Sequence, residues 1–402
     1  MKKIGFVAPW YGEKIPGGAE MELRGLVHHL KDVGVEVEVL TTCVKDFMSN
    51  WNENYYKEKD YIEAGISVKR FLVRRGNHDI FGKINAKILN NVVVSKEEEQ
   101  AFIKESIRST NLENYIKQNE KEYDLFVYIP YMFGTTYYGV LACPEKAVII
   151  PCLHDENYAY MNIYKKCFEK VRGIAFNARP ESELAYKLYQ IEKTETIISG
   201  VGVDTNLTGE AEHFRQKYQI EEPFLLYAGR KDKTKNVDLL IRYFEKYKRE
   251  NNNNLQLVMI GPAKIEIPES IQNEVHDLGF VPIQDKYDAY IAANILCQPS
   301  KNESFSLVIM ESWLAGRPVI VSEECAVTAN FVKESNGGFY FFDYYQFEVQ
   351  INYLLEHQEI ANKMGESGRN YVLKNFSWDV IVKKYMDFFQ KCSQKENLES
   401  TR

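Results

Sequence analysis

The chain has 402 residues, more than one ordinary core holds, since a domain typically contains about 100 to 200 residues. Hydrophobic residues make up 45% of it and charged residues 27%, a globular composition that excludes a collagen-like or wholly disordered chain. The net charge of −7 gives no overall positive field that would gather a polyanion, so nucleic acid is not expected as a partner.

Seven cysteines are scattered without a C-x-x-C pair, and a strand-like run, KKIGFVAPW, follows the first residue directly. This pattern predicts no disulfide framework, zinc ribbon or signal peptide, and it favours a reduced cytoplasmic protein. The longest apolar stretches, such as residues 147–153, are far shorter than the roughly 20 residues of a membrane-spanning helix. Aromatic residues, at 13%, are compatible with sugar-stacking surfaces, but they also fill ordinary cores, which is the interpretation we favour.

The first half of the chain alternates strands with helices. A buried strand (2–10), an amphipathic helix ending at Gly34 (19–34) and a second strand (35–42) open the series, and further strands are predicted at 66–73, 124–129, 147–152 and 173–176, with a helix from Lys96 to Gln118. Strands separated by helices predict a parallel sheet covered on both faces.

The pattern restarts near Pro223. Strands are predicted at 224–229, 255–261, 276–280, 295–300 and 318–322, with helices at 237–250 and 306–316. Periodicity lapses around residues 199–222, so we place the domain junction there and expect a cleft between two sheets. Ligands of open α/β sheets bind beyond the carboxyl ends of the strands, which directs attention to the loops that follow them.

The loop after the first strand contains neither a Walker G-x-x-x-x-G-K-[ST] nor a dinucleotide-binding G-x-G-x-x-G pattern. Gly17 and Gly18 instead stand just ahead of a helix, where a backbone without Cβ lets a ligand approach the free amides. A merely permissive turn explains this pair equally well.

Two cations follow a strand of the second series. Arg230 and Lys235 precede a helix, where a guanidinium fork and a point charge would neutralise a diphosphate. The alternative is a solvated loop, since Lys231 and Lys233 beside them are predicted to lie on the surface.

The third motif is Glu303 and Glu311, an E-x7-E pair. If the run is helical throughout, the carboxylates lie roughly 12 Å apart, a spacing that suits an extended ligand with a ribose at one end and a sugar at the other. Amides around residues 304–307 would face the phosphate between them. Glu311 is flanked by Met310 and Trp313, and a carboxylate in apolar company requires a partner.

Taken in order, these motifs resemble a known family. GGAE (17–20), HDEN (154–157), FNARPESE (176–183), GVD (202–204), GR…K (229–235) and E-x7-E (303–311) resemble the retaining glycosyltransferases of family 4, the glycosyl transferases group 1. The resemblance runs from about residue 4 to residue 390. It implies the α/β GT-B fold, two Rossmann-like doubly wound domains facing across a cleft, with a C-terminal helix that crosses back to the first domain.

The resemblance assigns the domains and the donor site. It implies an acceptor-binding domain (1–200), a nucleotide-sugar-binding domain (201–376) and a returning helix (377–402). By the same resemblance, Glu311 would hold the ribose and Arg230 and Lys235 the diphosphate. The remaining donor residues would be Glu303, Ser304, Phe305, Ser306 and Leu307 at the sugar, Gly17 and Gly18 at the phosphates or acceptor, and Phe280 and Val281 at the base.

His154 matches the family's active-site histidine, and with Glu303 it forms the expected catalytic set. Without the flanking motifs, a packed histidine would be the simpler interpretation. A metal triplet at HDE is disfavoured because consecutive residues of an extended segment point to opposite faces. This chain reads Glu303-Ser304-Phe305-Ser306 where many members read E-G-F-G, so the donor sugar is left open.

No Asp-x-Asp occurs in the chain, which favours transfer without a metal or other cofactor. Arg230, Lys235 and a helix N-terminus would then stabilise the leaving diphosphate. The resemblance implies transfer with retention from a nucleotide-diphosphate sugar, with UDP favoured and GDP-mannose next. The acceptor would be a saccharide or lipid-linked hydroxyl in cell-surface polysaccharide or glycoconjugate synthesis. A catalytically silent partner subunit of a transferase complex is the alternative.

The acceptor side is predicted in residues 69–87, a segment rich in cations. Arg70, Arg74, Arg75, His78, Lys83 and Lys87 cluster there, and Arg74, Arg75 and His78 are the candidate acceptor residues. One hypothesis is a phosphorylated or lipid-linked acceptor met at the inner face of a membrane. The alternative is a solvated segment with locally paired charges.

Overall fold

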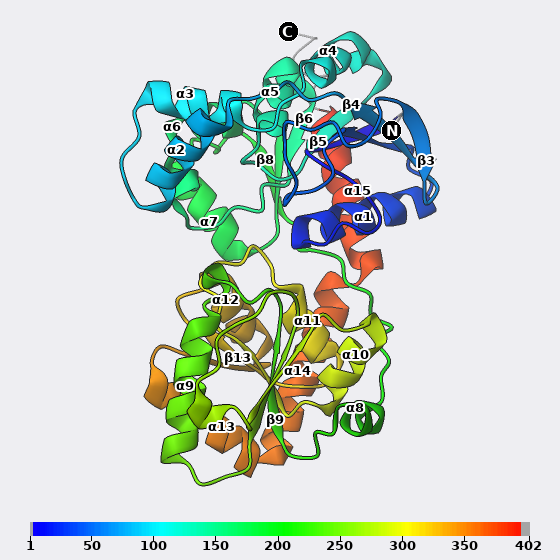
Figure 1. Cartoon of the computed structure of the whole chain (residues 1–402). Helices are drawn as coiled ribbons and strands as arrows, with labels where there is room; N and C mark the ends of the chain where they lie inside the picture. Colours follow the sequence, from blue (N-terminus) through cyan, green and yellow to red (C-terminus); the bar gives the residue numbers. More distant parts are fainter. Residues whose placement is uncertain (1–2, 395–402) are drawn as a thin grey trace. The chain divides into compact units, whose positions relative to one another are not determined.

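A computed structural model describes residues 3–394 of the chain and divides it into two units (Figure 1). Unit 1 takes the described residues up to Gly202 and from Trp378 onward, and unit 2 spans Val203–Ser377. An isolated parallel bridge pairs Val203 with Ser377. The first and last residues of unit 2 therefore lie side by side. No helix among residues 3–394 is long and apolar enough to cross a membrane.

The sheet of unit 1 grows outward from its first strand in both directions, with the order β3-β4-β2-β1-β5-β6-β7-β8. The strands are β1 (Ile4–Ala8), β2 (Val37–Thr42), β3 (Asp60–Glu63), β4 (Ile66–Phe71), β5 (Leu125–Tyr128), β6 (Ala147–Ile149), β7 (Gly173–Phe176) and β8 (Glu195–Ile198). Neighbours are parallel except for β3 and β4. The order reverses between β1 and β5, and right-handed crossovers then place helices on both faces and ligand sites near that reversal.

Eight helices accompany this sheet in the described part of the chain. They are α1 (Gly18–Asp32), α2 (His78–Leu89), α3 (Lys96–Glu105), α4 (Thr110–Asn119), α5 (Gly134–Ala142), α6 (Asn162–Phe168), α7 (Arg179–Leu188) and α15 (Trp378–Gln394). Buried apolar side chains of α2 to α7 pack on one face of the central strands, where Phe126 and Tyr128 of β5 lie, and form the largest core cluster among the described residues of the unit.

The single helix predicted from Lys96 to Gln118 is wrong, because the structure has α3 and α4 there. The Ser109 hydroxyl accepts a hydrogen bond from the Leu112 amide at 3.2 Å and donates to the Leu72 carbonyl at 2.6 Å. Serine at this position caps a new helix instead of continuing the old one. The apolar periodicity on both sides of the break concealed it.

The C-terminal helix α15 belongs to unit 1, as the resemblance implied. Its Trp378 ring stacks on His29 of α1 at 4.2 Å between centroids. A Cβ at Gly25 would come within 2.1 Å of Trp378, and one at Gly202 within 2.2 Å. Glycine is therefore required at both positions for the indole to pack here.

Unit 2 repeats the same topology in a fully parallel sheet of order β11-β10-β9-β12-β13-β14. The strands are β9 (Phe224–Ala228), β10 (Gln256–Ile260), β11 (Val275–Gly279), β12 (Ile295–Gln298), β13 (Val319–Ser322) and β14 (Gly338–Phe341). The helices are α8 (Ala211–Tyr218), α9 (Val237–Glu250), α10 (Ile283–Ala292), α11 (Leu307–Leu314), α12 (Ala326–Ser335), α13 (Tyr344–Glu356) and α14 (Gln358–Phe376). β9 and β12 are the central pair, so the loops that follow them meet at the ligand-binding edge.

Candidate active site

The loop after β9 holds the two predicted phosphate cations. Arg230 is 58% exposed at its side chain, and its Nε lies 3.6 Å from an Asp232 carboxylate oxygen. The Tyr227 hydroxyl donates to the Arg230 carbonyl at 2.6 Å, which fixes the backbone and leaves the guanidinium at the surface. Arg230 is thus available to an anion at this edge.

Lys235 ends the short 3-10 turn η4 (Lys233–Lys235). The Asp232 carboxylate caps this turn by accepting from the Thr234 and Lys235 amides at 3.0 and 3.1 Å. The Lys235 ammonium donates to Oε1 of Glu303 at 2.7 Å. The fold therefore joins the predicted diphosphate cation to the predicted sugar carboxylate across 68 residues of sequence.

Lys231 contradicts the predicted surface position. Its side chain is fully buried, and its ammonium lies 2.9 Å from Asp277 and donates to the Gly261 carbonyl at 2.5 Å. Because the pair is desolvated, Lys231 ties the β9 loop to β10 and β11 and is a structural cation. Nothing in the sequence distinguishes Lys231 from Arg230 and Lys233, which are both exposed.

Glu303 lies before the helix rather than on it, because α11 begins only at Leu307. The helical spacing of roughly 12 Å for the carboxylate pair therefore does not apply. Besides the hydrogen bond from Lys235, the Glu303 carboxylate accepts one from the side-chain amide of Gln298 at 3.2 Å. Its side chain is 11% exposed, so it is held in place yet open on one side.

Ser306 has a backbone φ of +86°, in a region that favours glycine. Its backbone conformation matches a position where many family members carry glycine. The Ser306 hydroxyl is buried and has no hydrogen-bond partner among residues 3–394, and the same is true of Ser300. Ser306 is the N-cap of α11 and Leu307 its first residue, while the Phe305 ring ahead of them is buried against Phe331 and Phe376.

The expectation that Glu311 needs a partner is confirmed. Its carboxylate accepts from the Lys286 ammonium at 2.6 Å and from the Tyr290 hydroxyl at 2.8 Å, both on α10. The side chain is 13% exposed. Two side chains one turn apart on α10 thus hold the Glu311 carboxylate in place.

Phe280 and Val281 follow β11. Phe280 is 83% exposed and Val281 is buried, while Gly279 ahead of them has a φ of +65°. The backbone here is exposed at a strand end, as contact with a base would require.

In unit 1, Gly17 caps α1 and Gly18 begins it. Gly17 has a φ of +142°, and a Cβ there would come within 1.9 Å of the Glu20 carboxylate. That carboxylate accepts from the Trp10 indole at 2.6 Å. Glycine is therefore needed at residue 17, and the first turn of α1 presents exposed backbone.

His154 lies in the loop after β6, with its side chain 31% exposed and Nδ1 3.6 Å from Glu156. The buried Glu181 carboxylate holds this loop from below, accepting from the Leu153 amide at 2.6 Å and the Asn177 amide at 2.5 Å. Burial raises the pKa of Glu181 to about 8. Glu181 therefore positions the residue that precedes His154.

Glu22 joins the same network and was missed in the sequence. Asn177 donates to its carboxylate at 2.9 Å, and burial raises the pKa of Glu22 to about 8. Glu22 shares the buried face of α1 with Leu26 and Leu30 at helical spacing, which is the signal that would have found it.

Replacing Glu22 with glutamine should remove a pH-dependent loss of stability. The folded protein keeps this proton up to about pH 8, whereas the unfolded chain releases it near its ordinary value, so wild-type stability falls as pH rises between them. The free energy of unfolding of wild type should fall relative to that of Glu22→Gln by up to about 1.4 kcal/mol per pH unit in that window. Urea denaturation at several pH values measures this. Parallel pH profiles would contradict it, and exposed Glu36→Gln is the control.

The cation-rich segment is largely paired. Arg70 is buried and donates to the Thr42 and Tyr11 carbonyls, at 3.0 and 2.7 Å. Arg74 pairs with Glu105 at 2.8 Å, and Lys87 pairs with Glu98. The structure thus favours locally paired charges over a basic patch, although Arg75 and Lys83 remain exposed.

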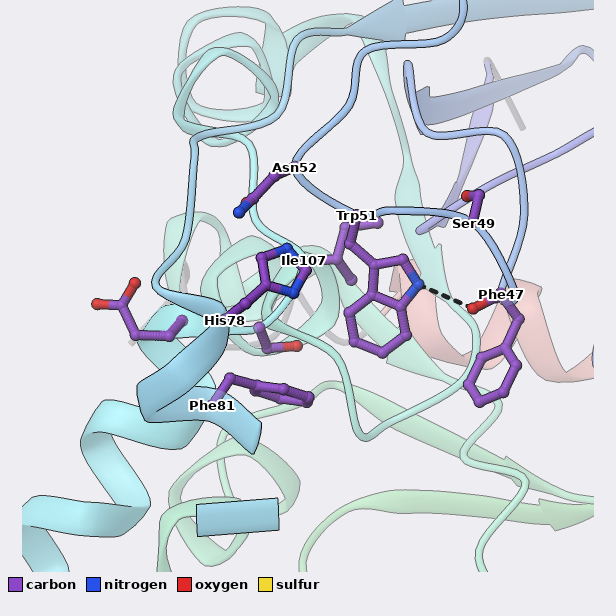
Figure 2. A pocket seen from close by; sticks show the side chains of 9 residues that line it. Phe47, Ser49, Trp51, Asn52, His78, Phe81 and Ile107 are labelled. Carbon is purple, nitrogen blue, oxygen red and sulfur yellow. Dashed lines mark hydrogen bonds between the residues drawn. The ribbon is translucent and has the colours of Figure 1, made fainter. Parts of the chain in front are cut away.

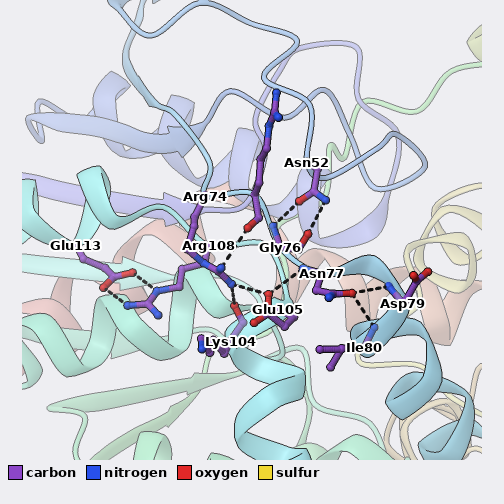
Figure 3. Close-up of polar contacts among 11 residues, drawn as sticks. Asn52, Arg74, Gly76, Asn77, Asp79, Ile80, Lys104, Glu105, Arg108 and Glu113 are labelled. Carbon is purple, nitrogen blue, oxygen red and sulfur yellow. Dashed lines mark hydrogen bonds and ion pairs between the residues drawn. The ribbon is translucent and has the colours of Figure 1, made fainter.

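The candidate acceptor residues have different environments. Arg74 donates to Glu105 and to the Lys104 carbonyl, at 2.8 and 2.5 Å (Figure 3). Arg75 and His78 are exposed, and His78 is the first residue of α2. Arg74 therefore supports the fold. All three residues line an open hollow, and His78 also lines the smaller pocket beside it.

The comparisons with known proteins agree with this fold. Residues 210–371 match the model of the glycosyl transferases group 1. An uncharacterized glycosyltransferase of Methanocaldococcus jannaschii is 24% identical over 58% of this chain and 62% of its own, and a D-inositol 3-phosphate glycosyltransferase of Xylanimonas cellulosilytica is 26% identical over 41% and 44%. The chain thus matches less than two thirds of the length of either relative. The crystal structure of Anabaena HepE in complex with UDP has a TM-score of 0.72 at 17% identity, covering 96% of this chain and 99% of that one.

The fold is therefore that of the GT-B glycosyltransferases, and unit 2 contains a region similar to a glycosyltransferase family domain. Within the chain, the match to the glycosyl transferases group 1 covers residues 210–371, which is most of unit 2.

Proposed function

We propose that this chain transfers a sugar from a nucleotide-diphosphate sugar to a hydroxyl of a saccharide or lipid-linked acceptor, with retention and without a metal ion. The observation that carries the proposal is the Lys235–Glu303 contact of 2.7 Å, with Arg230 in the same loop. A cation and a carboxylate held side by side match the two ends of a sugar phosphate, since one faces the phosphate and the other a sugar hydroxyl.

The chemistry needs a stabilised leaving group. As the bond from the sugar to the diphosphate breaks, negative charge grows on the diphosphate oxygens. Lys235, Arg230 and the amides at the start of α11 would meet that charge in unit 2. Glu311, held by Lys286 and Tyr290, would accept hydrogen bonds from the ribose hydroxyls.

The donor preference follows from the relatives. The Anabaena neighbour is described in complex with UDP, so we propose a UDP-sugar first and GDP-mannose second. His154 in unit 1 would lie near the transferred sugar. The acceptor and its place in cell-surface polysaccharide or glycoconjugate synthesis belong to the same proposal, as does any contact with a membrane through Arg75 and Lys83.

A thermal-shift screen tests the proposal. The full chain is heated with UDP, GDP, ADP and their sugars, each with EDTA and with Mg²⁺. A ligand that binds only the folded state raises the melting temperature as its concentration exceeds the dissociation constant. We expect UDP to give the largest shift and EDTA to leave it unchanged. No shift with any nucleotide would overturn the assignment, and a shift abolished by EDTA would overturn the metal-free mechanism.

A further inference from the structure

Unit 1 contains a small aromatic pocket that includes His78 of the cation-rich segment (Figure 2). It has a volume of about 200 Å³, and the residues that matter are Phe47, Trp51 and Asn52 from the loop after β2, His78 and Phe81 from α2, and Glu105 from the end of α3. We propose that this pocket, here called the aromatic pocket, binds one neutral, unphosphorylated pyranose ring of the acceptor. The inference rests on the proposed transferase function.

Three aromatic rings give the pocket its apolar surface. The Trp51 ring lies 5.8 Å from Phe47 and 5.6 Å from Phe81. Trp51 is anchored from behind by Phe133 at 5.7 Å, and its indole nitrogen donates to the Phe47 carbonyl at 3.0 Å. Phe47 remains 48% exposed. Fixed, partly exposed rings suit the C–H face of a sugar, because such contacts bury apolar area at little cost in side-chain entropy.

Polar groups stand beside the rings. The His78 imidazole, labelled in Figure 2, lines the pocket from the first residue of α2. Oε2 of Glu105 accepts hydrogen bonds from the Arg74 guanidinium and from the backbone amide of Asn77, both at 2.8 Å. His78 and Oε1 of Glu105 therefore remain for sugar hydroxyls, beside the side chains of Ser49, Asn52 and Ser106 that also line the pocket. A mostly apolar pocket with a few polar groups is the usual form of a small-molecule site.

Charge argues against a phosphate. The hollow next to the aromatic pocket is lined by Arg74 and Arg75 but also by Asp79 and Glu105 (Figure 3). Arg74 is already paired, and the amides of Asp79 and Ile80, which open α2, both donate to the Asn77 side chain at 3.1 Å. A phosphate here would meet two carboxylates and a helix end that is already capped, so a neutral ring fits better.

Location and size support an acceptor. The pocket follows the carboxyl ends of β2 and β4, at the edge of the sheet that also carries the His154 loop after β6. Trp10, in the loop after β1, contacts both Trp51 and Phe133, so one aromatic stack continues from the pocket to the centre of this edge. At about 200 Å³ the pocket is smaller than the roughly 300–1,000 Å³ of sites for larger ligands, which suits one pyranose ring.

Saturation-transfer NMR on the full chain tests the proposal. The probes are the methyl α-pyranosides of glucose, mannose and galactose, N-acetylglucosamine and glucose 6-phosphate. We expect at least one neutral pyranose to receive saturation, most strongly at its ring C–H protons. Trp51→Ala and Phe47→Ala should each weaken its affinity about tenfold, about 1.4 kcal/mol. Phe47 is half-exposed, so its variant tests the idea even if Trp51→Ala unfolds. Tyr55→Ala, an exposed aromatic in the same loop outside the pocket, is the matched control.

The outcomes separate this inference from the proposed function. If no neutral pyranose binds wild type, or if both pocket variants bind as wild type does, the aromatic pocket is not a sugar site. Tighter binding of glucose 6-phosphate, lost in Arg75→Ala, would replace it with a phosphate site. UDP-induced thermal shifts are measured on the same samples: sugar binding without a UDP shift contradicts the donor assignment alone, and the reverse contradicts only this inference.

Discussion

Replacing Lys235 with alanine should lower the rate of sugar transfer by about 10²–10³-fold, the usual effect of removing one group that stabilises developing negative charge. The Lys235 ammonium, 20% exposed, lies 2.7 Å from Glu303 and at the end of a capped turn. Alanine removes the cation and leaves Glu303 with only Gln298, so the loss should fall mainly on kcat. Steady-state kinetics with the best donor of the thermal-shift screen measures it.

Lys233 provides the control for this experiment. It is in the same turn, carries the same charge and is exposed, so Lys233→Ala should retain most of the activity. Lys235→Arg keeps the charge and should recover part of the rate. Equal rates in Lys233→Ala and Lys235→Ala would show that position 235 has no special role. An unchanged melting temperature in both variants would exclude loss of the fold.

Replacing Glu311 with glutamine should weaken nucleotide binding by about tenfold to a hundredfold, because hydrogen bonds to a charged acceptor contribute roughly 1.5–3 kcal/mol. The glutamine keeps the shape of the side chain but loses the charge that pairs with Lys286 at 2.6 Å. Calorimetric titration with UDP and with 2′,3′-dideoxy-UDP isolates the ribose contact. Wild type should prefer UDP, and Glu311→Gln should discriminate much less.

The control here is Glu324→Gln, an exposed carboxylate of the same unit that pairs with Lys301. Its nucleotide affinities should equal those of wild type. If Glu311→Gln still prefers UDP over the dideoxy analogue by the wild-type ratio, Glu311 does not contact the ribose. The effect would then belong to the packing of α11 on α10.

Local sequence patterns predicted much of the fold. The runs of apolar residues predicted the central strands of both sheets, because a strand buried on both faces must be apolar throughout. The E-x7-E, GR…K and GGAE motifs directed attention to loops that do leave the carboxyl ends of strands. Glu311 was expected to need a partner from its apolar neighbours alone, and it has two.

Other features were beyond sequence reasoning. Lys231 and Lys233 are neighbours in one polar loop, yet one is buried and the other exposed. The break between α3 and α4 depends on the Ser109 hydroxyl reaching Leu72, 37 residues earlier. The cation-rich segment predicted a candidate surface for an anionic partner. In the structure, Glu105 and Glu98 neutralise Arg74 and Lys87 of that segment.

The sequence by itself determined the fold class and the loops that carry the predicted donor residues, because these depend on local periodicity and on short motifs. Only the tertiary structure decided which charges are neutralised, which carboxylates are held and where aromatic rings leave a pocket. Lys235 meets Glu303 across 68 residues, and Trp51 faces residues of α2 and α3, because strands distant in sequence end at one edge of a sheet. Charge pairing and cavities depend on such distances in space, which a linear pattern does not contain.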